Sequence, residues 1–169
     1  MKIVIIGAGE VGFHVAKSLS ELDYDISVID IDHAKCSRAN EHLDVIVNQG
    51  NGSDEKLLKN INVADADYVF CLTNSDETNL ISSLQCHNLG AKKIIARLRD
   101  LDYSRNGNAI PPEKFGVDMV IHPEKEVAKE IIRLVKHPYA DKFYEFEGGK
   151  AVLFSVSYTH LRAHETTPH

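Results

Sequence analysis

The sequence has no hydrophobic run long enough to cross a membrane. Its longest apolar stretches, such as residues 3–6, fall far short of the roughly 20 residues that a membrane-spanning helix needs. Strand-like sequence begins at Lys2, with no positively charged leader or cleavage site before it. We therefore expect a soluble domain in the cytoplasm.

The sequence also has little positive charge. Lys and Arg number 19 against 25 Asp and Glu, which leaves a formal net charge of −6. No Lys/Arg run is longer than two, and no aromatic residues alternate with basic ones. This pattern provides no electrostatic surface for nucleic acid. With 43% hydrophobic residues in 169, the chain has enough apolar material for the core of about one domain.

Cysteine is scarce, and its spacing is not that of a metal or redox site. The three cysteines, Cys36, Cys71 and Cys86, are odd in number and form no C-x-x-C pair. Cys71 lies in an apolar run and Cys86 in a helical pattern, where a reduced thiol usually behaves as a small buried hydrophobe. We interpret them as structural and expect no metal site.

Familiar catalytic motifs are missing as well. The sequence contains no G-x-S-x-G, H-E-x-x-H or G-x-x-x-x-G-K-[ST] pattern. The sequence therefore gives no support for an α/β-hydrolase, a zinc protease or a P-loop NTPase.

Strand and helix patterns alternate along the chain. Short β-branched runs bounded by turn residues predict buried parallel strands, and apolar residues at helical spacing predict the helices between them. Expected strands cover residues 2–6, 25–30, 44–48, 67–72, 93–97 and 117–121. Expected helices cover residues 11–22, 34–43, 53–61, with Ser53 as N-cap, 76–89, ended by Gly90, and 124–137.

This alternation predicts a doubly wound α/β fold. Right-handed crossovers give a Rossmann-like, parallel six-stranded sheet with strand order 3-2-1-4-5-6 and helices on both faces. We expect this domain to span residues 1–140.

The last expected helix has apolar residues on more than one side. Val127, Ile131, Leu134 and Val135 form one stripe, with Ala128 and Ile132 beside it. The stripe is explained either by ordinary core packing or by contact with a second protomer.

After this helix the pattern changes. Residues 143–147 and 151–156 flank Gly148-Gly149 and predict a β-hairpin that begins a second lobe at residues 141–156. Residues 157–169 match nothing before them and resemble translated sequencing-adapter DNA. We interpret them as a non-native tail and do not read His160, His164 and His169 as metal ligands.

The residues from Gly7 to Gly12 form a G-x-G-x-x-G pattern between a strand and a helix. In that context Gly7 allows the tight turn, Gly9 lets the backbone approach a pyrophosphate, and Gly12 permits close packing of helix and strand. The free N–H groups at the start of the helix then face the anion.

Asp30 ends the second strand, where a carboxylate can accept hydrogen bonds from both ribose hydroxyls of an adenosine. Its charge would repel a 2′-phosphate, which favours NAD, ADP or ATP over NADP. The alternative is structural: glycines used for packing, and Asp30 used as a helix cap.

Other polar residues end neighbouring strands at the same edge of the sheet. Asn51 and Gly52 follow the third strand, and the Asn51 amide can bond an adenine edge. Thr73 follows the fourth strand and either contacts the ligand or caps the next helix. Arg97 ends the fifth strand and meets either a phosphate or a carboxylate such as Asp100.

A hydride-transfer enzyme needs a substrate site and an acid or base facing the nicotinamide, normally on a further domain. Only about 30 residues follow the sheet domain here, so we expect a sensor and not an enzyme. A truncated NAD-dependent dehydrogenase and a bare scaffold with a relict crevice are the alternatives.

Several of these segments together resemble the TrkA N-terminal domain family, also called RCK or KTN domains. The likeness covers about residues 1–140. It is carried by residues 3–12, 28–32, 50–53, 64–67, 72–80, 90–97, 115–124 and 134–138. Where the family commonly has Gly-Asp-Ala-Thr, this chain has Gly50-Asn51-Gly52-Ser53 and lacks the negative charge.

The resemblance implies a cytoplasmic regulatory subunit that binds NAD(H) or ADP/ATP and catalyses nothing. Gly7, Ala8, Gly9, Glu10 and Val11 would hold phosphates. Asp30 would hold the ribose, Asn51 and Gly52 the adenine region, and Thr73 and Arg97 the distal half of the ligand. Glu124 matches a family acidic position near phosphates or a cation.

The resemblance also implies an assembly. Homodimers would build a tetrameric or larger ring beneath an integral-membrane, potassium-translocating Trk subunit. The chain would then be a fragment, because family members continue into a second ligand-binding lobe.

Overall fold

The computed structural model describes residues 1–100, 103, 111–136, 142–146 and 151–155, the last two ranges by their backbone. The described residues belong to two compact units, Met1–Pro123 and Glu124–His169. The expected tail at residues 157–169 and the turn at Gly148-Gly149 lie outside the described residues. The expected domain boundary at residue 140 stays a prediction.

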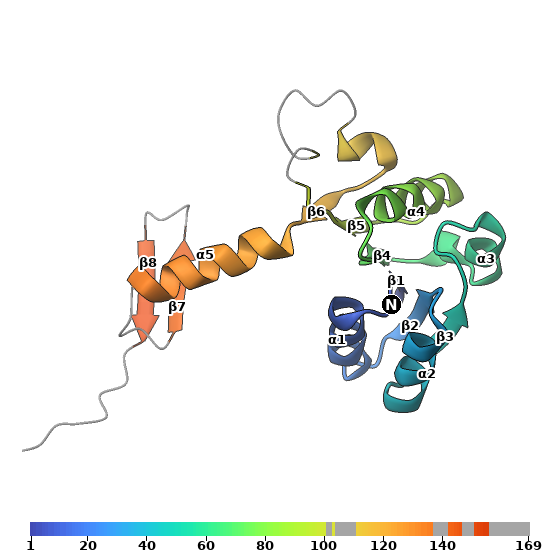
Figure 1. Ribbon diagram of the computed structural model, residues 1–169, viewed down its shortest axis with the longest axis horizontal. Coiled ribbons are helices and arrows are strands. Elements are labelled where there is room, and N and C mark those ends of the chain that lie inside the picture. The colour runs from blue at the N-terminus through green and yellow to red at the C-terminus, as the bar shows by residue number, and fades with distance from the viewer. Residues whose placement is uncertain (101–102, 104–110, 137–141, 147–150, 156–169) are drawn as a thin grey trace, which may run out of the picture. The chain divides into compact units, whose positions relative to one another are not determined.

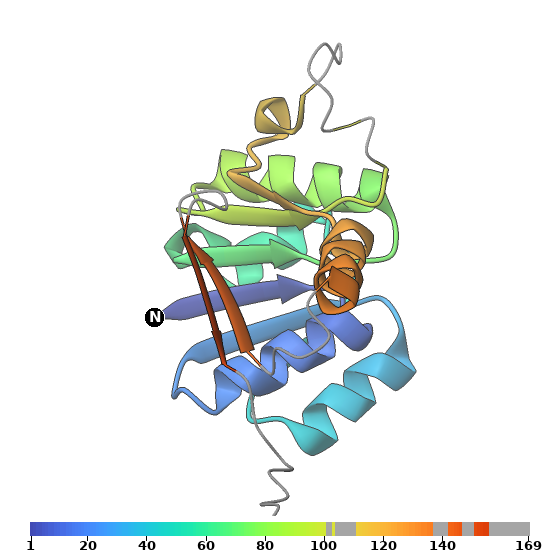
Figure 2. The ribbon, with the colours of Figure 1, turned by 90° about the vertical axis from the view of Figure 1, so that its left-hand side faces the viewer.

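The first unit is built on a six-stranded parallel sheet with strand order β3-β2-β1-β4-β5-β6. The predicted fold and strand order are confirmed. Figure 2 shows the arrows of β2, β1, β4 and β5 pointing the same way across the sheet. The strands are β1 Lys2–Ile6, β2 Asp25–Asp30, β3 Ile46–Gln49, β4 Tyr68–Cys71, β5 Ile94–Arg97 and β6 Met119–Ile121.

Helices cover both faces of this sheet (Figure 1). The α-helices of the unit are α1 Glu10–Ser20, α2 His33–His42, α3 Glu55–Asn60 and α4 Asp76–Leu89. Short 3₁₀ turns occupy η1 Val63–Asp65 and η3 Pro112–Phe115.

The alternation of side chains along β1 explains the two-layered core. Ile3 and Ile5 join a buried cluster that includes Ala16 of α1. Val4 and Ile6 point the other way into a cluster that includes Leu58 of α3 and Leu80 of α4. All four β1 side chains are at most 1% exposed, as expected for a strand with helices on both sides.

Most element boundaries differ from the prediction by one or two residues, and three of the element starts differ for identifiable local reasons. β3 begins at Ile46, because its pairing with β2 starts there and leaves Asp44 and Val45 before the ladder. β6 begins at Met119. The Val117 N–H is not part of the sheet, because it donates to the O of Pro112, the first residue of η3.

The third difference concerns the start of α3. Its N-cap is Asp54, whose Oδ1 accepts the Lys56 N–H at 2.9 Å. Ser53, the predicted cap, instead donates its hydroxyl to Asn51 Oδ1 at 2.8 Å. A carboxylate one residue later provides the same capping geometry with a full negative charge.

The second unit contains α5 Pro123–Lys136, which starts at the end of the first unit, and an antiparallel pair, β7 Lys142–Phe146 and β8 Ala151–Ser155. The predicted hairpin strands are therefore present. No described residue of α5 is buried, and its large apolar side chains are exposed at Val127, Ile131, Ile132, Leu134 and Val135. None of the described helices combines the length and the apolar character that spanning a bilayer requires.

Candidate functional site

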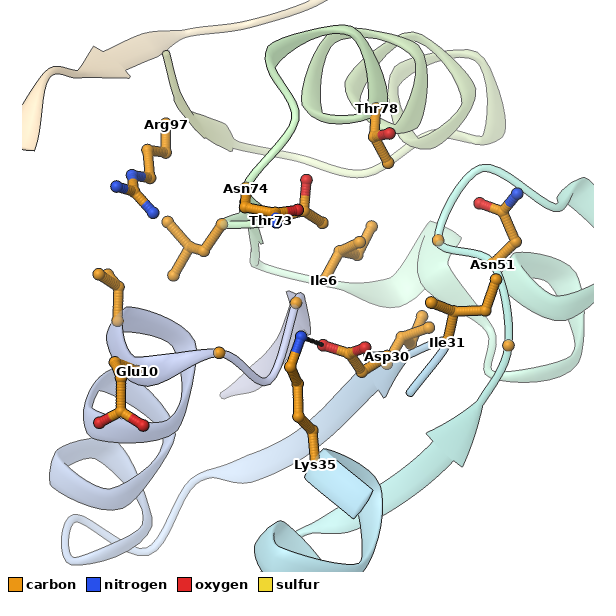
Figure 3. Close-up of a pocket in the computed structure, with 17 residues that line it drawn as sticks. Ile6, Glu10, Asp30, Ile31, Lys35, Asn51, Thr73, Asn74, Thr78 and Arg97 are labelled. Carbon is orange, nitrogen blue, oxygen red and sulfur yellow. Dashed lines mark ion pairs between the residues drawn. The ribbon is translucent and has the colours of Figure 1, made fainter. Parts of the chain in front are cut away.

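A cavity of about 320 Å³ lies at the carboxyl ends of β1, β2, β4 and β5 (Figure 3). This is the edge at which open parallel sheets bind ligands, between the first and fourth strands where the strand order reverses. Its lining comes from the loop after β1, the end of β2, the first turn of α2, the loop after β3, the start of α4 and the ends of β4 and β5.

The structure brings together nine of the eleven predicted site residues. They are Gly7, Gly9, Glu10, Val11, Asp30, Asn51, Gly52, Thr73 and Arg97. Ala8 and Gly12 lie behind the lining. A Cβ on Gly12 would stand 1.8 Å from Gly7 O, so Gly12 serves the helix–strand packing that the motif predicts.

Gly7 makes the turn out of β1. Its φ of +105° lies in the region that side chains disfavour, and a Cβ there would stand 2.8 Å from the Thr73 backbone nitrogen. The loop therefore bends tightly against the end of β4. The Gly9 position is open: no heavy atom lies within 4 Å of a Cβ built on it.

Asp30 connects the end of β2 to the glycine loop. It is 9% exposed, its Oδ2 accepts the Ala8 N–H at 2.7 Å, and its Oδ1 accepts the Asp32 N–H at 2.9 Å. The cap of α2 is Asp32, which accepts the Ala34 N–H, so Asp30 is not a helix cap. The two bonds fix the carboxylate at the cavity wall and leave further lone pairs for hydroxyl donors.

Lys35 is a lining residue that the sequence reasoning did not single out. Its Nζ pairs with Asp30 Oδ2 (Figure 3), at 3.9 Å. The same Nζ lies 4.0 Å from Asp32 Oδ2. Thr78, in the first turn of α4, was also missed. Their positions could have been predicted from the sequence. Lys35 and Thr78 each lie in the first turn of a helix, and each helix starts shortly after a strand that ends at the cavity.

Glu10 opens α1 beside the glycine loop, but its carboxylate is held by another helix. Arg38 Nη1 donates to Glu10 Oε1 at 2.6 Å, and the Arg38 guanidinium lies 4.1 Å from the centroid of the Phe13 ring. The hydrogen bond from Arg38 holds the pKa of Glu10 below its ordinary value. Figure 3 shows this carboxylate turned away from Asp30 and Arg97, so its charge is directed away from the cavity.

Asn51 forms a turn with its own side chain. Its Oδ1 accepts the Ser53 N–H at 3.0 Å and the Ser53 hydroxyl at 2.8 Å. The amide nitrogen is then the group with which Asn51 can meet a purine, as a donor to a ring nitrogen.

Thr73 and Arg97 end β4 and β5 and are joined by a buried side chain between them. Asn79 of α4 bonds the backbone of both residues and the hydroxyl of Thr73. The N-cap of α4 is Ser75, whose Oγ accepts the Thr78 N–H, so Thr73 is not the cap. Figure 3 shows Thr73 and Arg97 on the part of the cavity away from Asn51.

This fold and cavity define a Rossmann-type domain with a glycine-rich loop after β1 and a carboxylate at the end of β2. Its sequence matches the family model described as TrkA-N domain over residues 3–123. The chain belongs to the TrkA-N domain family.

Curated relatives agree with this membership. The chain is 36% identical over 156 residues to a Trk system potassium uptake protein TrkA homolog of Archaeoglobus fulgidus, covering 92% of this chain and 35% of that protein. It is 36% identical over 157 residues to the Trk system potassium uptake protein TrkA of Halomonas elongata, covering 92% and 34%. The chain thus spans about a third of the length of these relatives.

Solved structures share the fold. The TrkA-N domain of inner membrane protein ybaL from Escherichia coli superposes with a TM-score of 0.69 at 19% identity, covering 79% of this chain and 96% of that one. The Shewanella denitrificans Kef CTD in AMP-bound form gives 0.64 at 19%, covering 83% and 84%. The GsuK channel bound to NAD gives 0.65 at 17%, covering 86% and 25%.

Proposed function

We propose that this chain is the nucleotide-sensing part of a regulatory protein for potassium uptake, and that it binds NAD(H), ADP or ATP in the cavity. The observation that carries this proposal is the meeting of the glycine loop and the Asp30 carboxylate at one cavity at the carboxyl edge of the sheet. Family membership supports the role: curated relatives are named as potassium uptake proteins, and solved structures of the same fold are named with AMP or NAD bound.

The ligand would lie across the switch point of the sheet. Gly7 to Val11 border the phosphates. The Gly7 and Ala8 N–H groups are donated to Ile29 O and Asp30 Oδ2, so the N–H groups of Gly9, Glu10 and Val11 at the start of α1 are the ones left for the phosphates, and the helix dipole favours the anion. Asp30 accepts the ribose hydroxyls, Asn51 and Gly52 border the adenine, and Arg97 and Thr73 meet the distal half. Lys35 adds a cation beside the ribose position.

The chain would act by binding and not by turnover. A ligand shifts an equilibrium between two states only through unequal affinity for them, and moving the balance from 1:99 to 99:1 takes about 5.5 kcal/mol. Several protomers of a ring can share this free energy. The competing function, a fragment of an NAD-dependent dehydrogenase, requires the nicotinamide and discriminates strongly against ADP and ATP.

The partners follow from the same proposal. The chain would form a homodimer, assemble into a tetrameric or larger ring, and contact an integral-membrane potassium-translocating Trk subunit at the cytoplasmic face. The exposed apolar residues of α5 support a protomer contact, because contiguous exposed apolar surface marks interaction sites. Glu124, in the first turn of α5, is proposed only as a favourable charge at that helix end.

The test is a calorimetric titration of the whole 169-residue chain with NAD, NADH, ADP and ATP. We expect binding of more than one of these nucleotides without turnover. An Asp30→Asn substitution removes the negative charge and should weaken all of them by at least about tenfold, since hydrogen bonds to a charged group contribute about 1.5–3 kcal/mol.

Asp44→Asn is the matched control, because Asp44 is exposed and lies before β3, away from the cavity lining. This substitution should leave the affinities unchanged. Absence of binding by folded wild-type protein would refute the proposed function. Binding of NAD and NADH alone would favour the dehydrogenase fragment.

A further inference from the structure

Asn79 is a fully buried amide that lies behind two cavity-lining residues, Thr73 and Arg97. It belongs to the first turn of α4, is 0% exposed, and bridges the ends of β4 and β5. Its four hydrogen bonds go to Thr73 and Arg97, two residues that line the cavity.

The partners of Asn79 determine which way its amide faces. Nδ2 lies 3.2 Å from Thr73 O and 2.7 Å from Arg97 O, and carbonyl oxygens only accept hydrogen bonds. The NH₂ group must therefore occupy this side. Oδ1 then faces the Thr73 N–H at 2.9 Å and the Thr73 hydroxyl at 2.7 Å, both of which donate to it.

This orientation decides whether the Thr73 hydroxyl donates or accepts a hydrogen bond on the side that faces the ligand. A hydroxyl has one proton and two acceptor lone pairs. Its proton has two acceptors within the protein, Asn79 Oδ1 at 2.7 Å and Ser75 O at 3.1 Å. One lone pair receives the Ser75 N–H at 3.3 Å, so a single acceptor lone pair is left for a ligand.

We propose that Thr73 is a specificity-determining residue that accepts a hydrogen bond from the ligand, and that Asn79 is the positioning residue that sets this polarity. Phosphate oxygens offer only acceptors, whereas the second ribose of a dinucleotide offers hydroxyl donors. The distal part of the cavity therefore selects the second ribose, and phosphate oxygens are left to the glycine loop and Arg97. This inference rests on the proposed nucleotide-binding function.

ADP and ADP-ribose are the probes that separate the two kinds of contact, because they differ by the second ribose. The experiment titrates both into the full chain and into a Thr73→Val variant of nearly the same volume. Valine should weaken ADP-ribose about five- to tenfold, the loss of one hydrogen bond, and change ADP less than twofold. Retained ADP binding shows in the same sample that the variant is folded.

Thr73→Ser is the matched control, because it keeps the hydroxyl and should retain the wild-type preference. An equal loss for ADP and ADP-ribose in Thr73→Val would overturn the proposal, since it would show that Thr73 donates to a phosphate. Unchanged affinity for both would overturn it as well. If wild-type protein binds neither probe, the proposed function itself fails.

Asn79→Leu tests the positioning role. Without the amide acceptor, the Thr73 hydroxyl keeps only the longer bond to Ser75 O, at 3.1 Å, and turns its proton toward the ligand more readily. The ratio of the ADP and ADP-ribose affinities should therefore move toward one. A merely structural role would weaken both ligands in proportion and leave that ratio unchanged, which would overturn the assignment of Asn79.

Discussion

At the residue scale, the glycines of the loop between β1 and α1 have different tasks although they belong to one motif. A Cβ at Gly12 would collide with Gly7 O at 1.8 Å, whereas a Cβ at Gly9 would meet no heavy atom within 4 Å. Gly9 lines the cavity and Gly12 does not. Gly12 therefore serves the fold, and Gly9 leaves room for the proposed ligand.

This difference gives a paired prediction. Gly12→Ala should lower the free energy of unfolding by more than about 3 kcal/mol, because backbone must move to admit the methyl group. Gly9→Ala should cost less than about 1 kcal/mol of stability yet weaken ADP by at least about tenfold, since its methyl occupies the phosphate position. Urea unfolding and calorimetry measure the two effects. Equal loss of stability in both variants would contradict the division of roles.

The residue scale also shows how far the site could be predicted. Gly7, Gly9 and Asp30 follow from a motif with fixed spacing, because the turn and the strand ends leave few places for such residues. Lys35 and Thr78 reach the cavity from the first turns of helices, and their approach depends on how α2 and α4 pack on the sheet. The polarity of Thr73 depends on Asn79, whose partners come from two strands.

At the element scale, α5 differs from the other helices of the chain. The helices α1 to α4 each bury at least one residue against the sheet, whereas α5 has none buried among the residues described. Its exposed residues Ile131, Leu134 and Val135 follow Val127 or Ile131 by three or four positions, so all of them share one face of the helix.

The proposed protomer contact predicts that Ile131→Lys shifts the chain from dimer to monomer. A charge in the middle of the apolar face must be desolvated when a partner covers it, which disfavours association. Sedimentation velocity over a range of concentrations measures the change. Lys125→Ala, on the same helix but outside the stripe, should leave the dimer intact. A wild-type chain that sediments as a monomer throughout would refute the contact.

At the scale of the whole molecule, the buried cysteines report on opening of the first unit. Cys71 and Cys86 are 0% exposed and belong to the core beneath α4, as the sequence predicts for structural thiols. Burial raises the pKa of Cys71 to about 12 and raises that of Cys86 as well. Both thiols are therefore protonated and shielded at neutral pH, and they react only when the core opens.

We expect both thiols to resist a disulfide reagent at pH 8 in the native state and to react in concentrated urea. A nucleotide at about 100 times its Kd stabilises the folded state by about 2.7 kcal/mol, so labelling should slow about 100-fold. The measurement uses a Cys36→Ala variant, because the Cys36 thiol contacts the Asp30 carbonyl oxygen and a bound nucleotide would shield it directly. Rapid native labelling, or labelling insensitive to a nucleotide that binds, would contradict this coupling.

The sequence by itself determined the class of fold and the edge of the sheet at which the site lies, with its glycine loop and Asp30. Hydrophobic periodicity and strand-ending glycine and aspartate are local signals, and right-handed crossovers leave one strand order for them. Only the tertiary structure decided that Asp30 anchors the glycine loop through Ala8, that Arg38 holds the Glu10 carboxylate away from the cavity, and that Asn79 orients Thr73. These contacts join residues distant in the chain or on different elements, and their geometry exists only after the helices have packed on the sheet.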